Sequence, residues 1–147
     1  MFGPHLALDC YQCDQALLED LSLVYETLDE CPDHIGMTKI MPPYVFRHDA
    51  PGGAEFGFSG FVLIAQSHIS LHTFPDRGLM GADIFSCTTF DVEEAIVALK
   101  QTFQPQRVDW QILDRGSEFP RDIAGSRAEA GQERRRLATA LELEAMR

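Results

Sequence analysis

The chain has 147 residues, 45% of them hydrophobic and 10% aromatic, which is enough for the core of one domain. Its formal net charge is -11, from 23 acidic and 12 basic residues, and this excludes a nucleic-acid partner because phosphate binding needs a basic surface. No apolar run approaches the roughly 18 residues of a membrane span, and the start does not resemble a secretory signal. We therefore expect a cytoplasmic protein without a membrane partner.

The first third of the chain predicts a strand, a helix and a second strand. Residues 5–10 (HLALDC) are typical of a short apolar strand. Asp14 can cap the helix that follows, whose apolar face comes from residues 17–28, and Pro32 is expected to end it. Residues 36–41 predict the second strand.

The rest of the chain predicts a loop, a group of strands, a helix and a last strand. Glycines and Pro51 in residues 48–57 predict a mobile loop. Three strands then follow closely, separated first by residues 66–68 and then by a turn at residues 75–78. Asp91 is expected to cap a helix with an apolar face. The expected elements are strands over 58–65, 69–74 and 80–87, a helix carrying residues 95, 96, 99 and 103, and a strand over 108–113.

This order of elements predicts an α+β fold. Strands grouped together, with a helix before and after them, favour a two-layer sandwich in which a mostly antiparallel sheet carries helices packed on one face. We assign residues 1–116 to this domain. Residues 117–147 are polar and predict a helical C-terminal tail, to which we assign no chemistry.

Cysteine and histidine pairs raise the question of a metal site. Cys10-x-x-Cys13 has no second such pair, and four cysteines at irregular spacing do not suggest a disulfide framework. His68 and His72 fall on the same face of one strand, but zinc needs two more ligands. We expect no metal.

The stretch from Ser59 to Cys87 (SGFVLIAQSHISLHTFPDRGLMGADIFSC) carries the most specific pattern in the chain. It resembles the processing and catalytic core of the proenzymes of prokaryotic S-adenosylmethionine decarboxylases, which cleave themselves and depend on a pyruvoyl group. Without a gap, Ser59, Ser67, His72 and Cys87 fall where the four working residues of that family fall. The resemblance extends over roughly residues 3–116 and makes Cys10 and Cys13 part of the end of the first strand.

The resemblance implies autocatalytic cleavage between Gln66 and Ser67. The Ser67 hydroxyl attacks the Gln66 carbonyl in an N-to-O acyl shift, and the Ser59 hydroxyl stabilises the oxyanion. His72 then removes the Cα proton of residue 67, a task that suits an imidazole near neutral pH. β-Elimination and hydrolysis leave a covalent pyruvoyl cofactor in place of Ser67.

The resemblance also implies a lyase that decarboxylates a small cationic substrate. The pyruvoyl carbonyl forms a Schiff base with the substrate amine and accepts electrons as CO2 leaves. The thiol of Cys87 returns a proton to the substrate α-carbon. Phe74 and Asp76 match substrate-binding positions that the family fills with Trp and Glu. With S-adenosylmethionine as substrate, the product serves spermidine biosynthesis in polyamine metabolism.

Two departures from the family pattern leave alternatives open. Gln66 replaces the glutamate before the cleaved bond, and Gly53 stands at the position of an adenine-stacking phenylalanine, for which Phe46, Phe56 or Phe58 are possible substitutes. The same chemistry on arginine or ornithine is therefore an alternative. Another is an uncleaved, non-catalytic homologue that binds a ligand.

Two further expectations concern geometry. Residues 67 and 72 are an odd number apart and point to opposite faces of a straight strand, so their joint action predicts a turn or bulge at residues 66–68. Members of the family at this chain length form homodimers with sites near the interface. A sheet with helices on one face leaves its other face to be covered, which agrees with a homodimer.

Overall fold

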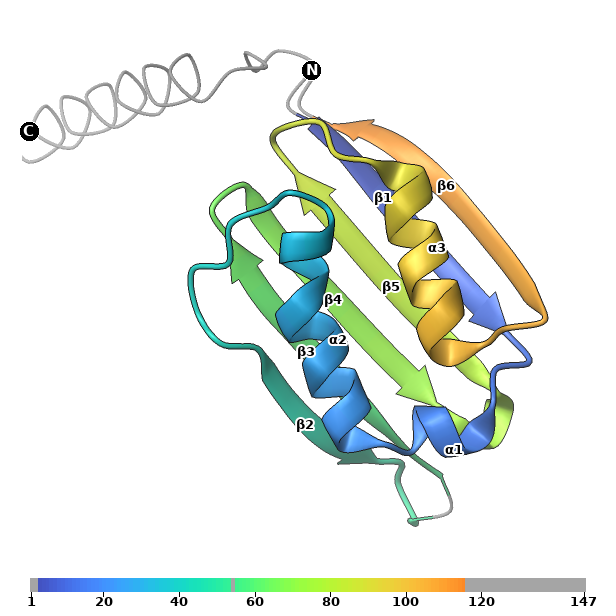
Figure 1. Ribbon diagram of the computed structural model, residues 1–147. Coiled ribbons are helices and arrows are strands. Elements are labelled where there is room, and N and C mark those ends of the chain that lie inside the picture. Colours follow the sequence, from blue (N-terminus) through green and yellow to red (C-terminus); the bar gives the residue numbers. More distant parts are fainter. Residues whose placement is uncertain (1–2, 54, 116–147) are drawn as a thin grey trace, which may run out of the picture.

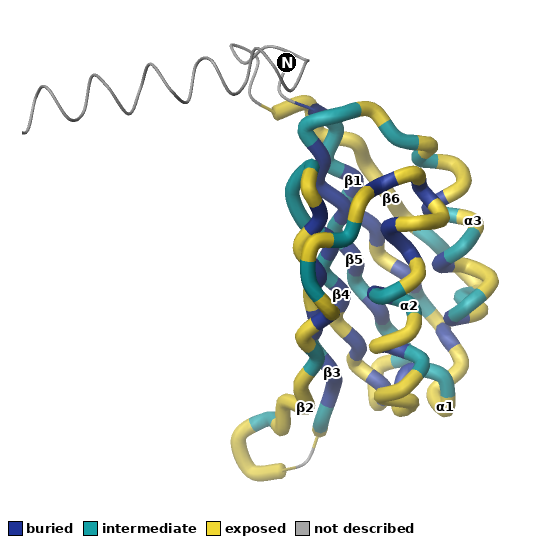
Figure 2. The backbone as a smooth tube through the Cα atoms, turned by 60° about the vertical axis from the view of Figure 1, so that its left-hand side comes forward, coloured by how far each residue is buried: buried dark blue, intermediate teal, exposed yellow. Residues whose placement is uncertain are grey.

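The computed structural model describes residues 3–53 and 55–115, which form a sheet covered by helices on one face (Figures 1 and 2). The sheet has six strands in the order β2-β3-β4-β5-β1-β6, and all five pairings are antiparallel. The α+β prediction is confirmed. The elements are β1 Gly3–Tyr11, α1 Gln15–Leu18, α2 Leu21–His34, β2 Tyr44–Asp49, β3 Phe56–Ile64, β4 Ser67–Phe74, the 3-10 helix η1 Pro75–Arg77, β5 Leu79–Ser86, α3 Val92–Phe103 and β6 Arg107–Arg115.

The core lies between the sheet and the helices. Every second residue of the central strands points toward α2 and α3, because side chains alternate between the faces of a strand. Leu6, Leu71 and Ile84 come from three strands, and each is at most 1% exposed. Leu28 of α2 and Phe103 of α3 close the other side. Full burial of such a side chain contributes about 1.5–3 kcal/mol.

The first helical segment differs from the prediction of one helix ended by Pro32. The chain forms α1 and α2, each with its own aspartate cap: Asp14 accepts a hydrogen bond from the Ala16 N–H and Asp20 from the Leu23 N–H. Pro32 is buried inside α2, which continues to His34. The predicted cap of α3 is confirmed, since the Asp91 carboxylate accepts from the Glu94 N–H at 2.9 Å.

The predicted strand over residues 36–41 is wrong. That segment makes one isolated bridge, Lys39 with Ile64, and the edge strand β2 comes after the two prolines. The predicted loop over 48–57 is correspondingly shorter, since β2 ends at Asp49 and β3 begins at Phe56. Gly52 and Gly53 turn the chain between these strands with φ of 93° and 69°, a conformation that glycine adopts at little cost.

The predicted tail over residues 117–147 lies outside the described residues. Among the helices within residues 3–115 that the structure describes, none has both the length and the apolar character needed to cross a bilayer.

Candidate functional site

The sheet face opposite the helices, here called the open face, carries most of the candidate residues. Strand register arranges its side chains in rows. One row holds His5, Phe85 and His68 from β1, β5 and β4. A parallel row, four positions away along both β4 and β5, holds Gly81, His72 and Ser59. The rows separate the candidates into two groups along the strands.

The first group lies at the end of the sheet where β4 begins. A two-residue turn, Ala65 and Gln66, joins β3 to β4, so Ser67 is the first residue of β4. The backbone carbonyl of Gln66 accepts a hydrogen bond from the Cys87 N–H at 2.9 Å. The Gln66 side-chain oxygen accepts another from the Thr38 N–H at 3.3 Å. The carbonyl that precedes Ser67 is thus fixed and polarised by the residue that the resemblance makes the proton donor.

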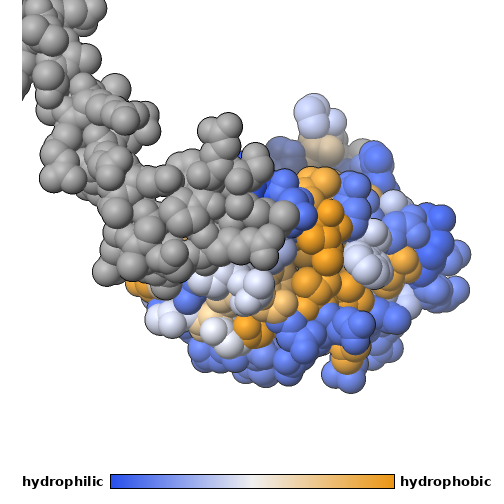
Figure 3. All heavy atoms as spheres, turned by 90° about the horizontal axis from the view of Figure 1, so that it is seen from above, coloured by the Kyte–Doolittle hydropathy of each residue, from blue (hydrophilic) through white to orange (hydrophobic). Residues whose placement is uncertain are grey.

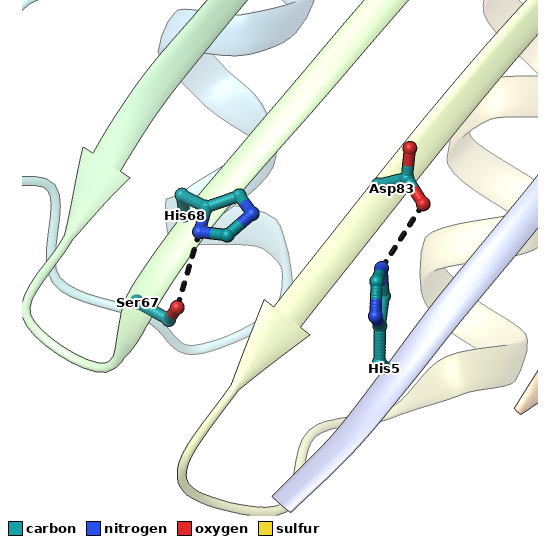
Figure 4. Close-up of polar contacts among 4 residues, drawn as sticks. All are labelled: His5, Ser67, His68 and Asp83. Atoms are coloured by element: carbon teal, nitrogen blue, oxygen red, sulfur yellow. Dashed lines mark hydrogen bonds and ion pairs between the residues drawn. The ribbon is translucent and has the colours of Figure 1, made fainter. Parts of the chain in front are cut away.

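Histidines border this end on the open face (Figure 4). The Ser67 hydroxyl lies 3.2 Å from His68 Nδ1, and His5 Nε2 lies 3.0 Å from a carboxylate oxygen of Asp83. The Phe85 ring lies between the two imidazoles, with centroid distances of 5.4 Å to His5 and 5.8 Å to His68. Seen from above in Figure 3, hydrophobic residues gather in the middle of the described surface with hydrophilic ones around them.

The second group lies toward the other end of the same face. The Ser59 hydroxyl lies 2.9 Å from His72 Nδ1, across the β3–β4 pair. A cavity of about 240 Å³ opens beside them, and an ion pair between Glu55 and Arg77 at 2.9 Å spans its rim. Its lining residues are His48, Ala50, Glu55, Phe56, Gly57, Ser59, Thr73, Phe74, Asp76 and Arg77.

The lining of this cavity distinguishes among the three phenylalanines that could stack on a nucleobase. Phe56 lines it, together with Phe74 and Asp76. Phe58 is buried toward the helices, only 6% exposed, and cannot face it. Phe46 is exposed on β2 opposite Ser59, outside the lining. Phe56 is therefore the best placed of the three.

The structure does not bring the four predicted working residues together within one chain. Ser67 lies beside Cys87, and Ser59 lies beside His72. The structure has a turn at Ala65 and Gln66, but no bulge follows it, because the register of β4 runs without interruption from Ser67 to Phe74 on both of its neighbours. Five extended residues separate Ser67 from His72 by roughly 16 Å.

The remaining cysteines do not form a site. The hydrogen bond between the thiols of Cys10 and Cys13 raises the pKa of Cys10 and lowers the pKa of Cys13, and burial also raises that of Cys10. Burial raises the pKa of Cys31 to about 12, so this thiol stays protonated. Within the described part of the chain, no three His, Cys, Asp or Glu side chains are grouped to hold a metal ion.

The sequence interpretation missed His5, Asp83 and the contact of His68 with Ser67. From the sequence, His68 stands out only as a possible metal ligand, although its position next to Ser67 is a usable signal for a role in cleavage. The His5–Asp83 pair had no such signal, because 78 residues separate its members and only the β1–β5 register joins them.

Most of the chain is similar to known proteins of one family. A profile described as S-adenosylmethionine decarboxylase matches residues 4–116. The S-adenosylmethionine decarboxylase proenzyme of Archaeoglobus fulgidus is 34% identical over 115 residues, 78% of this chain and 97% of that protein, and that of Acidithiobacillus ferrooxidans is 30% identical over 115 residues, 78% and 82%. The crystal structure of the adenosylmethionine decarboxylase from Aquifex aeolicus superposes with a TM-score of 0.60 at 29% identity, covering 77% of this chain and 89% of that one. The chain therefore belongs to the S-adenosylmethionine decarboxylase family.

Proposed function

We propose that this chain is the proenzyme of a self-cleaving, pyruvoyl-dependent decarboxylase that converts S-adenosylmethionine to its decarboxylated form and CO2. The observation that carries the proposal is the hydrogen bond from the Cys87 N–H to the Gln66 carbonyl, 2.9 Å long. An acyl shift at Ser67 places negative charge on this oxygen, and a donor already in position stabilises it. The sequence predicted Ser59 in this role, but Ser59 lies with His72 further along the strands.

The residues around Ser67 fit the formation of a pyruvoyl group from that serine. Ser67 follows a tight turn, is half-buried, and has its hydroxyl beside an imidazole. The pyruvoyl group, once formed, supplies an electron-accepting carbonyl for the substrate's α-amine. Cys87 is half-buried next to the cleaved bond, and its thiol can hold the proton that the substrate α-carbon takes up after CO2 leaves.

A second copy of the chain is part of this proposal. Ser59 and His72 are too far from Ser67 to act on it within one chain, so they would act on the partner's Ser67 across a homodimer interface. The open face offers the surface for it, because large apolar side chains are exposed there. They include Tyr44, Phe46, Phe61, Leu63 and Phe74, each between 37% and 58% exposed. An apolar patch of this kind on a sheet is typical of a protein interface.

The cavity beside Ser59 is the proposed place for the substrate's nucleoside. Phe56 and Phe74 offer aromatic surfaces, and Asp76 a carboxylate, in a cavity of about 240 Å³. Stacking on such rings favours a flat base, and a carboxylate accepts hydrogen bonds from ribose hydroxyls. Arginine and ornithine have neither a nucleobase nor ribose hydroxyls to use these two contacts together, so the cavity favours the nucleoside substrate. A cytoplasmic location would give the enzyme access to it.

Two measurements test the proposal. Intact mass should show the purified chain splitting into residues 1–66 and 67–147, with the larger fragment resistant to Edman degradation. The processed protein is then incubated with carboxyl-labelled S-adenosylmethionine, arginine and ornithine. We expect labelled CO2 from the first alone. Release from arginine or ornithine instead would overturn the substrate, and a chain that stays unsplit would overturn the enzymatic function.

A further inference from the structure

The Ser67 hydroxyl and the His68 ring form a nucleophile–base contact that the assigned roles do not use. His68 Nδ1 lies 3.2 Å from the Ser67 oxygen (Figure 4). A hydroxyl is a weak nucleophile until a neighbouring base removes its proton, and a base acts within about 2.6–3.2 Å. With the ring proton on Nε2, Nδ1 of His68 accepts the hydrogen bond from Ser67. The contact therefore has the geometry of an activated serine.

The carbonyl that Ser67 must attack belongs to Gln66, the last residue of the turn before β4, and a hydrogen bond holds it in place. Gln66 contributes its backbone carbonyl to the reaction. The oxygen of this carbonyl accepts a hydrogen bond from the Cys87 N–H at 2.9 Å. The nucleophile Ser67, the base His68 and the Cys87 N–H as oxyanion donor thus all lie next to the Gln66–Ser67 bond of one chain. Such a set is what acyl transfer requires.

The orientation of His68 is fixed by its packing. Phe85 meets the imidazole edge to face, at 5.8 Å and 67° between the ring planes. Phe85 is itself only 8% exposed, because His5 packs beside it and the Arg115 guanidinium lies 4.3 Å from its ring centre. A ring held in this way keeps Nδ1 directed at Ser67.

Two other histidines of the open face are engaged elsewhere. His72 is hydrogen-bonded to Ser59 and lies roughly 16 Å from Ser67 along the strand. His5 is bonded to Asp83. Among the described residues, His68 is thus the titratable side chain in contact with the Ser67 hydroxyl.

We propose that His68 is the general base of the first step of self-cleavage, a role that rests on the proposed function. His68 Nδ1 takes the Ser67 hydroxyl proton as the Ser67 oxygen bonds to the Gln66 carbonyl carbon. The carbon–nitrogen bond between Gln66 and Ser67 then breaks, and the proton passes from His68 to the departing nitrogen. The product is an ester with a free amine on Ser67. His72 of the partner subunit would act only afterwards, in the elimination.

The test measures ester formation separately from elimination. Purified proenzyme is incubated with hydroxylamine, which cuts the ester as soon as it forms, and loss of intact chain is followed by mass. His68→Ala and His68→Gln should cleave about 100-fold more slowly than the wild type, in the range of general-base catalysis. Free imidazole should restore part of the rate of His68→Ala. His34→Ala, at the exposed end of α2, is the matched control and should cleave normally.

The outcomes separate clearly. Cleavage of both His68 variants within threefold of wild type in hydroxylamine would overturn the role of His68. So would a slow rate that imidazole leaves unchanged in protein with a native circular dichroism spectrum, because that is the result of a structural role. A wild-type chain that hydroxylamine never cuts would overturn the proposed function and this role together.

Discussion

The two ends of the β3–β4 pair contain similar residue types but differ in what they can do. Each has a serine hydroxyl within hydrogen-bond distance of an imidazole Nδ1: Ser67 with His68 at 3.2 Å, and Ser59 with His72 at 2.9 Å. Ser67 follows a turn, and the carbonyl before it accepts a hydrogen bond from the Cys87 N–H outside the regular ladder. Ser59 sits in the middle of a paired strand, where its own peptide bond is part of the ladder. A serine–histidine contact is therefore not enough, and the backbone around the serine decides which of the two becomes reactive.

The largest expected difference between the two ends is in cleavage itself. Ser67→Ala should abolish it, because no other atom can start the acyl shift at this bond. Ser59→Ala should slow processing by about 100-fold, which is the usual effect of losing one hydrogen-bond donor to an oxyanion. In the proposed dimer this oxyanion forms at the partner's Ser67. Intact mass over several days measures both, and Ser70→Ala, on β4 between the two ends, is the control. Fast cleavage of Ser67→Ala would remove the distinction altogether.

Mixed dimers test whether the two ends meet across an interface. The single variant His72→Ala should stall at the ester, which hydroxylamine then cuts. In a dimer of one Ser67→Ala chain and one His72→Ala chain, one site would combine an intact Ser67 with an intact histidine from the other chain. We expect the His72→Ala chain alone to be processed in co-expressed, differently tagged protein. No processing of either chain would mean that each protomer acts on itself.

Cys87 should affect the reaction after cleavage more than cleavage. Cys87→Ala keeps the backbone N–H that contacts the Gln66 carbonyl, so the chain should still split at a rate close to wild type. Loss of the thiol removes the proton donor, and labelled CO2 per processed chain should fall about 100-fold. An unsplit Cys87→Ala chain would show instead that the thiol, not the N–H, supports the acyl shift.

The smallest expected effect is at Gln66, where the family has glutamate. The Gln66 side chain only accepts a hydrogen bond from the Thr38 N–H, 3.3 Å long and exposed. Gln66→Glu would strengthen this bond by about 1 kcal/mol at most, so the cleavage rate should change by no more than about fivefold. A time course by gel electrophoresis measures it. A change of 100-fold would assign the side chain a role in the chemistry.

The sequence was sufficient for the fold and for the identity of the candidate residues, but not for their grouping. Aspartates before apolar runs located the helix starts at Asp14 and Asp91, because capping is local. The strand at 36–41 was misplaced, since the edge strand depends on pairing with β3, which is not local. The spacing of Ser59, Ser67 and His72 in the sequence identifies these residues as candidates. Spacing does not give the distance between their side chains in the folded sheet. In the proposed dimer a second copy completes the site, and the residue pattern of one chain does not show which residues meet across that interface.

The strand order has a consequence for the lifetime of the cut protein. The proposed cleavage after Gln66 would assign β1, β2 and β3 to one piece and β4, β5 and β6 to the other, and β1 lies between β5 and β6. The pieces are thus interleaved, and they can separate only if the β3–β4, β5–β1 and β1–β6 pairings all break. Refolding would then require two chains to meet in solution, whereas the original chain folded as one. The processed protein would thus fold once, and its persistence would be set by the rate of its first unfolding and not by an equilibrium.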